Sequence, residues 1–306
     1  LPHDIIFPMP EKNKIAVVIP YYNASKHIER VIKKLPNFID VIYIVDDCGT
    51  EPLPNNFTND KITIIKNKNN LGVGGATKAG FKKAITDDVD IVVKVDADDQ
   101  MDTVYIKDLV EALVNKKAEY AKGNRFRDFK ALNKMPLGRK VGNLMLSFLV
   151  KAATGYWNNF DPTNGFFAIE VNTLKHLDFS NISNRYYFET SLIAELYFQE
   201  TRIYDVPMPA IYGDETSSMS VWKMPFVFLP RLFKTFVKRI IKSYFVYDFN
   251  MSSIYILLGI PLFLFGVIYG CYTWWFYSSR DIFAPTGTIM LVTLTIILGF
   301  QLLLQA

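Results

Sequence analysis

Three carboxylates and an amide stand close together at the end of residues 91–100, Ile-Val-Val-Lys-Val-Asp-Ala-Asp-Asp-Gln. The β-branched run before them predicts a buried strand, and the ligands of open α/β sheets collect where such strands end. Side chains two positions apart on an extended segment point the same way, so we expect Asp96, Asp98 and Gln100 to converge while Asp99 faces elsewhere. Oxygen ligands of this kind suit Mg²⁺ or Mn²⁺ better than zinc. The spacing therefore indicates a candidate metal site.

The same acidic residues allow a second interpretation, in which they only support the start of a helix. Asp102 and Thr103 follow directly, and a helix is expected to begin there. An acidic side chain at a helix N-terminus accepts hydrogen bonds from free backbone N–H groups. The spacing alone leaves the metal site and the helix cap open.

A second acidic pair, Asp46 and Asp47, ends another predicted strand at residues 41–45. In a nucleotide-binding α/β domain, a carboxylate at this place can accept hydrogen bonds from ribose or base. A solvated turn before Gly49 would explain the pair equally well. Both explanations stay open on the sequence.

Residues 69–76, Asn-Asn-Leu-Gly-Val-Gly-Gly-Ala, look at first like a phosphate-binding loop. Thr77 stands where the dinucleotide fingerprint has its third glycine, and the Gly-Lys-Ser/Thr of a P-loop does not follow. These departures argue against a dehydrogenase or a P-loop enzyme. We expect Gly74 and its neighbours to let a helix from Ala76 start close to a nucleotide, with free N–H groups at its end.

The elements that must position these side chains alternate between strands and helices. Strands are predicted at residues 14–20, 41–45, 62–65, 91–95 and 119–122, and helices at 74–86 and from Ser25, which could cap its own helix. This alternation predicts an α/β fold with a mostly parallel, doubly wound sheet. Residues 186–200 predict an amphipathic helix with Glu189 at its head, where the carboxylate serves either the helix N-terminus or the chemistry.

The C-terminal part of the 306-residue chain is much more hydrophobic than the rest. Residues 254–277 and 286–306 carry no charge, and each stretch is long enough to cross a membrane as a helix, the first with a bend at Pro261. Before them, Pro225 and Pro230 are expected to divide the chain into short amphipathic helices at the membrane interface. We therefore expect a catalytic domain at 1–220, interface helices at 221–250 and two transmembrane helices at 251–306.

Charge and cysteine content indicate the side of the membrane. Five cations precede the first apolar stretch, which predicts that both termini and the catalytic domain are cytoplasmic. They are Arg231, Lys234, Lys238, Arg239 and Lys242. Residues 1–10 do not resemble a signal peptide, and Cys48 and Cys271 are too few for a disulfide framework. The formal net charge of +4 is mild, and we expect no nucleic-acid partner.

Four segments together resemble the nucleotide-sugar-binding half of a family-2 glycosyltransferase of the GT-A type. These segments are Ile19-Pro20-Tyr21-Tyr22-Asn23, Val45-Asp46-Asp47, residues 69–76 and Asp96-Ala97-Asp98-Asp99-Gln100. Residues 122–126 and 161–166 are similar to segments of the polyprenyl-phosphate branch, which includes dolichol-phosphate mannose synthases and undecaprenyl-phosphate glucosyltransferases. The resemblance runs from about residue 15 to the C-terminus, since two membrane helices after the catalytic domain also fit that branch.

The resemblance implies an inverting, metal-dependent transfer of a sugar from a nucleoside-diphosphate sugar to a polyprenyl phosphate. It assigns the metal and the diphosphate to Asp96, Asp98 and Gln100. It assigns the nucleotide sugar to Pro20, Tyr22, Asp46, Asp47, Gly74 and Asp96, and the acceptor phosphate to Arg125, Arg139 and Asn143. Asp96, Asp98 and Glu189 are the implied catalytic residues, and Mg²⁺ or Mn²⁺ is the implied cofactor. The lipid bilayer and a second copy of the chain are further candidate partners.

Two other transferase classes and an inactive scaffold compete with this interpretation. A processive polysaccharide synthase carries Gln-x-x-Arg-Trp, whereas residues 199–203 have this spacing without the Trp, and two membrane helices are few for a polymer channel. A transferase that adds a sugar to a lipid-linked saccharide would need a base such as Glu189. An inactive scaffold would have no need to keep Asp96, Asp98 and Gln100 together.

Overall fold

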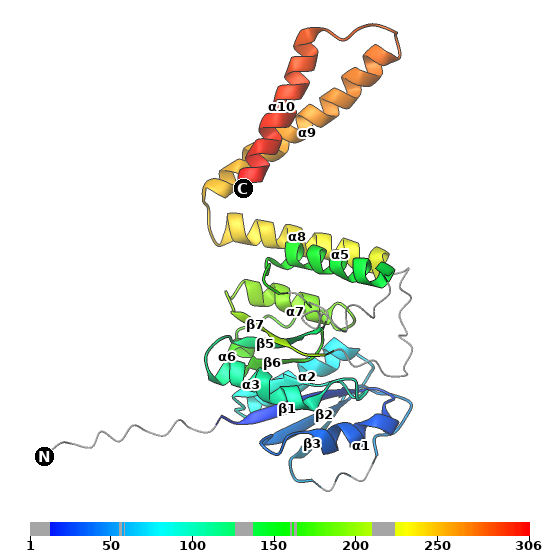
Figure 1. Cartoon of the computed structure of the whole chain (residues 1–306), viewed down its shortest axis with the longest axis vertical. Coiled ribbons are helices and arrows are strands. Elements are labelled where there is room, and N and C mark those ends of the chain that lie inside the picture. The colour runs from blue at the N-terminus through cyan, green and yellow to red at the C-terminus, as the bar shows by residue number, and fades with distance from the viewer. Residues whose placement is uncertain are drawn as a thin grey trace, which may run out of the picture. The chain divides into compact units, whose positions relative to one another are not determined.

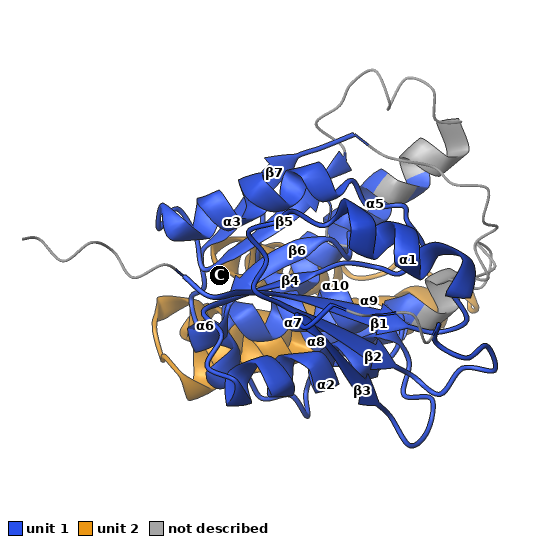
Figure 2. Ribbon diagram, turned by 90° about the horizontal axis from the view of Figure 1, so that it is seen from below, with its two compact units in different colours: residues 1–236 blue, residues 237–306 orange. Residues whose placement is uncertain are grey.

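The computed structural model describes residues 13–54, 57, 59–125, 137–159, 161, 164–209 and 224–306. The chain forms two compact units, residues 1–236 and residues 237–306 (Figure 2). The candidate catalytic residues all belong to the first unit, and the two long apolar helices belong to the second.

A seven-stranded sheet forms the centre of the first unit (Figure 1). Its strands are β1 (Ile15–Tyr21), β2 (Val41–Asp46), β3 (Ile62–Lys66), β4 (Ile91–Lys94), β5 (Tyr120–Asn124), β6 (Phe167–Glu170) and β7 (Ile203–Pro207). The order is β3-β2-β1-β4-β6-β5-β7, and β6 is antiparallel to both of its neighbours while the other pairs are parallel. The mostly parallel α/β sheet predicted from the sequence is confirmed.

The strand order reverses between β1 and β4. The chain runs from β1 outward through β2 and β3, and then returns to add β4 on the other side of β1. Ligands of such sheets bind in the crevice outside the carboxyl ends of the strands at this reversal. Tyr22 follows β1 and Asp96 follows β4, so both candidate motifs lie at this point.

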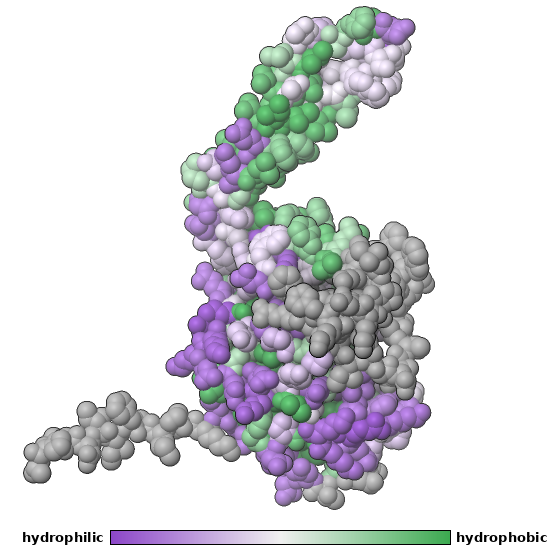
Figure 3. All heavy atoms as spheres, in the orientation of Figure 1, coloured by the Kyte–Doolittle hydropathy of each residue, from purple (hydrophilic) through white to green (hydrophobic). Residues whose placement is uncertain are grey.

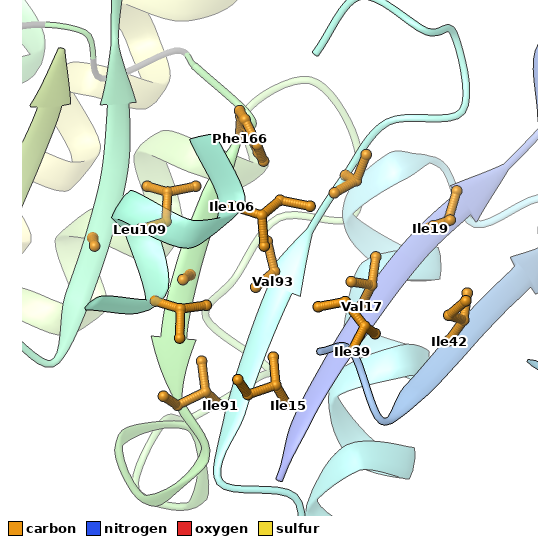
Figure 4. Close-up of a cluster of buried hydrophobic side chains, with 14 of the residues drawn as sticks. Ile15, Val17, Ile19, Ile39, Ile42, Ile91, Val93, Ile106, Leu109 and Phe166 are labelled. Atoms are coloured by element: carbon orange, nitrogen blue, oxygen red, sulfur yellow. The ribbon is translucent and has the colours of Figure 1, made fainter. Parts of the chain in front are cut away.

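Helices cover both faces of the sheet, because successive side chains of each strand point to opposite faces. Ile15, Val17 and Ile19 of β1 pack against α1 (Ser25–Lys34) and α3 (Ile106–Val114), with the 3₁₀ helix η1 (Thr103–Tyr105) just before α3 (Figure 4). On the opposite face, Ala16 and Val18 pack against α2 (Val73–Thr86), α6 (Val171–Lys175) and α7 (Phe188–Tyr197). The doubly wound arrangement follows from this alternation.

Three details of the helices differ from the expectations. Ser25 begins α1 but does not cap it; its hydroxyl instead donates to Oε2 of Glu51 at 2.7 Å. Helix α7 is buried almost all round rather than amphipathic, because it lies between the sheet and α5 (Leu137–Thr154). Helix α8 is continuous over Met224–Ile241, although breaks at its prolines were expected. Pro225 sits in the first turn, where no N–H is needed, and Pro230 is tolerated inside the helix.

The second unit contains the helices α9 (Met251–Ser278) and α10 (Thr286–Gln305), preceded by the short helix η3 (Lys242–Val246). Both long helices have a mean hydropathy of 2.2 over their most apolar windows and could cross a membrane by length and composition. They pack closely at small residues: a Cβ at Gly266 would lie 2.7 Å from Ile296, and one at Gly299 would lie 2.5 Å from the backbone of Phe263. Two apolar helices were predicted, and two are found; α9 continues through Pro261.

Candidate functional site

Two cavities meet at Asp96 and Asp98, just beyond the end of β4. The larger cavity, of about 670 Å³, is lined by residues that follow β1, β2 and β4 and by the start of α2. The smaller cavity, of about 180 Å³, lies toward β5, β6 and α7. Asp96 and Asp98 line both cavities, so a molecule in one would share these carboxylates with a molecule in the other.

Most of the predicted site residues line one of these two cavities. The larger cavity brings together Pro20, Tyr22, Asp47, Asp96 and Asp98. The smaller cavity brings together Asp96, Asp98, Gln100, Arg125 and Glu189. Asp46 and Gly74 are not among the described residues that line either cavity. Arg139 and Asn143 lie in α5, and their side chains are outside what the structure describes.

The carboxylates after β4 point in different directions, as expected, although the cause is a turn at residues 97–99 and not the alternation of an extended strand. Asp99 has a φ of 60°, and its carboxylate bonds Lys34 at 2.7 Å and Arg30 at 3.5 Å, away from the cavities. Asp98 accepts a hydrogen bond on Oδ1 from the backbone N–H of Gln100 at 3.1 Å. The helix cap is a different residue, because Asp102 accepts from the N–H of Val104 at the start of η1. The cap therefore does not account for Asp96 and Asp98.

The donor atoms near Asp98 suit a hard divalent cation that takes its remaining ligands from the substrate or from water. Asp98 and Gln100 offer carboxylate and amide oxygens along the smaller cavity. Within the described part of the chain, no three His, Cys, Asp or Glu side chains group closely enough to hold a metal by themselves. A diphosphate and water would therefore have to complete the coordination, which is how Mg²⁺ is usually bound.

Lys94 is one of the site residues that the sequence did not reveal. Its side chain is 1% exposed, and its Nζ lies 2.5 Å from Oδ1 of Asp96 and 3.9 Å from Oε1 of Glu189. Burial lowers the pKa of Lys94, but Asp96 and Glu189 outweigh burial and the pKa is raised above its ordinary value. Lys94 is therefore a buried cation that links the two carboxylates. The only sequence signal was a lysine inside a β-branched run.

Glu189 enters the smaller cavity from the first turn of α7. Its side chain is 14% exposed, and burial raises its pKa above the ordinary value although Lys94 opposes this shift. Gly165 leaves the space that these groups need, because a Cβ there would lie 2.5 Å from Nζ of Lys94 and 3.1 Å from Oε1 of Glu189. The glycine is thus required by the packing of Lys94, not by a turn.

Arg125 stands at the mouth of the smaller cavity and is held by Asp161. Its Nε donates to Oδ2 of Asp161 at 2.7 Å and its Nη2 donates to Oδ1 at 3.0 Å, with the backbone N–H of Arg125 adding a third bond at 3.1 Å. Asp161 is fully buried while the side chain of Arg125 is 42% exposed. Burial raises the pKa of Asp161, but Arg125 and Lys122 reverse the shift and keep the carboxylate ionised. The pair presents a fixed guanidinium to the cavity.

Several N–H groups of the glycine-rich segment are already bound within the protein. Asp47 accepts hydrogen bonds from the N–H groups of Leu71 at 2.9 Å and Gly72 at 2.7 Å. The N–H of Gly75 donates to the carbonyl of Asn184 at 3.0 Å. Helix α2 begins at Val73 rather than Ala76, so Gly75 lies within its first turn, while Leu71 and Gly72 come just before the helix.

The glycines of this segment are instead explained by a neighbouring loop. A Cβ at Gly74 would lie 2.4 Å from the carbonyl oxygen of Ser183 and 2.7 Å from the ring of Phe188. Gly72 adopts a φ of 86° and faces Arg185, whose Cγ would lie 2.9 Å from a Cβ there. The loop before α7 therefore lies against the start of α2. It brings Arg185 and Tyr186 into the larger cavity, where the sequence gave no sign of them.

Comparison with known proteins places this site in a family. The model of "Glycosyl transferase family 2" matches residues 16–178. A UDP-N-acetylglucosamine–dolichyl-phosphate N-acetylglucosaminyltransferase of Methanococcus voltae is 34% identical over 219 residues, which are 65% of this chain and 86% of that protein. A dolichol-phosphate mannosyltransferase of Pyrococcus furiosus is 26% identical over 180 residues, 55% of this chain and 49% of that protein.

Solved structures share the fold. Glucosyl-3-phosphoglycerate synthase from Mycobacterium tuberculosis, in complex with Mn²⁺, UDP-glucose and phosphoglyceric acid, gives a TM-score of 0.54 at 17% identity, covering 74% of this chain and 79% of that one. This likeness confirms the GT-A fold that the sequence motifs predicted. With the family match over residues 16–178, it shows that the chain belongs to glycosyltransferase family 2 and is a glycosyltransferase.

Proposed function

We propose that the chain transfers a sugar, with inversion, from a nucleoside-diphosphate sugar to a polyprenyl phosphate at the membrane surface. The observation that carries the proposal is the shared position of Asp96 and Asp98 between the two cavities. A donor in the larger cavity and an acceptor phosphate in the smaller one would meet at these carboxylates. The dolichyl-phosphate transferases among the relatives support this class of acceptor.

The larger cavity suits the donor. Its volume of about 670 Å³ lies within the range of about 300–1,000 Å³ that is usual for small-molecule sites. Pro20 and Tyr22 would contact the nucleoside, and Asp98 with Gln100 would hold Mg²⁺ or Mn²⁺. The bound cation would neutralise the diphosphate as it leaves. Asp96 has Oδ1 bound by Lys94, so we assign it to orienting the donor rather than to a full share of the metal.

The smaller cavity suits a phosphate acceptor. Arg125 presents a guanidinium fixed by Asp161, and such a group binds phosphate with a defined orientation. A phosphate monoester with a second pKa of about 6 is an anionic nucleophile at neutral pH and needs no general base. Its oxygen would form the new bond to the anomeric carbon while the bond to the diphosphate breaks and its electron pair stays on the diphosphate oxygen. Direct attack of this kind inverts the anomeric centre.

One observation favours a second candidate acceptor, a sugar hydroxyl of a lipid-linked saccharide. Glu189 lines the smaller cavity, and burial raises its pKa toward the range of a general base. In the phosphate mechanism the same carboxylate would position the sugar and balance Lys94. The two mechanisms differ in whether activity requires Glu189 to accept a proton.

Apolar side chains on α5 and α8 support a location at the membrane surface. The two helices pack together around Val150, Phe228 and Leu232 (Figure 1). Their outer faces expose large apolar residues: Leu144, Met145 and Phe148 on α5, and Leu229 and Phe233 on α8. Arg231 and Lys234 are exposed beside them on α8, as expected for a helix that meets anionic headgroups.

The second unit would anchor the chain in the bilayer. Its helices α9 and α10 carry a mostly hydrophobic surface (Figure 3). The cations at residues 231–242 come before α9, and the rule that positive residues stay inside would place the catalytic domain and both termini in the cytoplasm. A membrane-embedded polyprenyl chain would then have its phosphate at the level of the first unit.

Transfer by the purified chain tests the proposal. The chain in lipid nanodiscs is incubated with polyprenyl phosphate, Mn²⁺ and UDP-N-acetylglucosamine, UDP-glucose or GDP-mannose labelled in the sugar. We expect label in the organic phase with at least one donor. Asp98→Asn is the matched control, because it removes one charge without changing side-chain volume, and we expect it to abolish transfer. A wild-type chain that labels no lipid with any donor would contradict the proposal.

A further inference from the structure

The larger cavity has an unusual balance of charge for a site that would bind a diphosphate. Among its described lining residues, three are carboxylates, Asp47, Asp96 and Asp98, and one is a cation, Arg185. A diphosphate in such a cavity would be repelled unless cations offset the carboxylates. A divalent metal at Asp98 would supply part of that charge, and the rest has to come from the protein.

Several backbone N–H groups near this cavity are already bound and do not supply the remaining charge. Oriented N–H groups at a helix N-terminus are a common phosphate site, and α2 begins at the edge of this cavity. The N–H groups of Leu71 and Gly72 are bound by Asp47, and that of Gly75 is bound by Asn184. A side-chain cation in the cavity wall would supply charge that these bound N–H groups do not.

Arg185 is held in the cavity wall by the loop that carries it. The carbonyl of Asn184 accepts from Gly75 at 3.0 Å, and the N–H of Ser183 donates to Oγ of Ser191 at 2.8 Å. The aliphatic part of the Arg185 side chain lies over Gly72. A side chain at position 72 would displace it. These contacts fix the backbone just before Arg185, and the aliphatic part of its side chain lies along the start of α2.

The guanidinium of Arg185 has its hydrogen-bonding capacity available. No described residue accepts a hydrogen bond from it or forms an ion pair with it. Arg125 differs in this respect, because Asp161 binds two of its guanidinium nitrogens. A guanidinium offers five N–H donors in a planar fork, an arrangement that matches phosphate oxygens.

We propose that Arg185 is the protein cation that binds the diphosphate of the donor nucleotide. The inference rests on the proposed function, since it assumes a nucleoside diphosphate in the larger cavity. Arg185 supplies charge that the bound N–H groups of Leu71, Gly72 and Gly75 do not, and Gly72 leaves room for the aliphatic part of its side chain. Because the negative charge on the diphosphate increases as the sugar departs, Arg185 stabilises the leaving group as well as the bound donor.

Binding measurements on the full chain in detergent test the inference. UDP and GDP are titrated calorimetrically with Mn²⁺ present, and uridine and guanosine are titrated by ligand-observed NMR. Hydrogen bonds to charged groups contribute about 1.5–3 kcal/mol, so Arg185→Gln should weaken the nucleoside diphosphate by about ten- to a hundredfold. The matching nucleoside should bind as it does to the wild type. Arg185→Lys should recover part of the loss because it restores the charge without the fork.

The control is Arg202→Gln, which also removes one surface guanidinium, but this one lies just before β7 and is paired with Glu119. Its nucleotide binding should equal that of the wild type. Unchanged diphosphate binding in Arg185→Gln, or an equal loss of nucleoside and diphosphate, would overturn the inference, as would a wild-type chain that binds neither UDP nor GDP. Transfer to polyprenyl phosphate is measured separately. A wild type that binds a diphosphate but labels no lipid contradicts the proposed function. The binding data then still decide whether Arg185 binds the diphosphate.

Discussion

Nζ of Lys94 lies 2.5 Å from Oδ1 of Asp96, and the lysine side chain is almost entirely buried beneath the point where the two cavities meet. The same Nζ lies 3.9 Å from Glu189 on α7. A buried lysine is stable only when carboxylates compensate its charge, so the three groups form one unit. This unit fixes Asp96, which lines both cavities, and Glu189, which lines the smaller one.

Gly165→Ala should disturb this unit without removing a charge. The added Cβ would lie 2.5 Å from Nζ of Lys94, so the ammonium must move away from Asp96 or Glu189. We expect kcat to fall by about tenfold or more, because a displacement of about 1 Å in a catalytic group can cost about a hundredfold. Nucleotide affinity should change little. The measurement is steady-state transfer with both substrates varied.

Gly287→Ala is the matched control, since nothing lies within 4 Å of a Cβ at that position. It should keep wild-type kcat. If Gly165→Ala also kept wild-type kcat, Lys94 would have no positioning role toward the two carboxylates.

Arg125→Ala and Arg139→Ala should weaken use of the lipid acceptor more than binding of the nucleotide. Losing one charged hydrogen bond costs about 1.5–3 kcal/mol, so the acceptor KM or kcat/KM should change by about ten- to a hundredfold. Removing Arg125 also leaves the buried Asp161 unpaired, and the double variant Arg125→Ala, Asp161→Asn separates this effect from acceptor binding. Equal losses in nucleotide affinity, measured calorimetrically, would assign both arginines to the donor.

The pH profile of Glu189→Gln separates the two acceptors. With a phosphate acceptor, the acidic limb of the rate should follow the second phosphate ionisation, with a pKa of about 6, in the wild type and in the variant alike. Glu189→Gln should keep a substantial part of the activity. With a hydroxyl acceptor, the rate would fall as Glu189 becomes protonated, at a pH above the ordinary glutamate range because burial raises its pKa. Glu189→Gln would then lose nearly all activity, and the acidic limb of its pH–rate profile would disappear. An external nucleophile such as azide would restore turnover.

Lys122 gives a pH dependence of stability that is independent of catalysis. It is fully buried on β5, and burial lowers its pKa from 10.5 to about 8. Between these two values the unfolded chain binds more protons than the folded chain, so the free energy of unfolding should rise with pH from about 8 to 10.5. The full rise from this group is about 3 kcal/mol, at about 1.4 kcal/mol per unit.

We compare thermal unfolding of the wild type and of Lys122→Met from pH 7 to pH 10.5 in the same detergent. The comparison isolates the contribution of Lys122, because other groups titrate equally in both proteins. The difference in unfolding midpoint between the two proteins should shift in favour of the wild type as the pH rises. A constant difference across this range would show that burial does not lower the pKa of Lys122 in the folded protein.

The carboxylates at the strand ends could be predicted because local spacing determines them. The predicted separation of Asp99 from Asp96 and Asp98 is observed, but a turn after Lys94 produces it rather than strand alternation. Lys94 could not be predicted in the same way, because its buried position depends on Glu189 in a helix far along the chain. The alternating pattern of a strand gives no information about a partner such as Glu189 on a distant helix.

The glycine-rich segment and the loop before α7 show the same limit. From the sequence, Gly74 fits a phosphate site, whereas in the fold it contacts Ser183 and Phe188. Arg185 stands in a polar stretch and enters the larger cavity only because that loop lies over α2. Contacts between distant segments were missed, whereas the positions of Asp96 and Asp98 beyond a strand end were expected, and their roles stay predictions.

The fate of the donor's β-phosphate tests the proposed reaction most directly. The wild-type chain in nanodiscs is given polyprenyl phosphate and a nucleoside-diphosphate sugar labelled with ³²P at the β-phosphate and with ³H in the sugar. Attack on the anomeric carbon predicts that all ³²P stays in the aqueous phase as nucleoside diphosphate while ³H moves to a lipid with a single phosphate. Recovery of ³²P in the lipid, or of ³H only on a lipid-linked saccharide, would contradict transfer of the sugar to a polyprenyl phosphate.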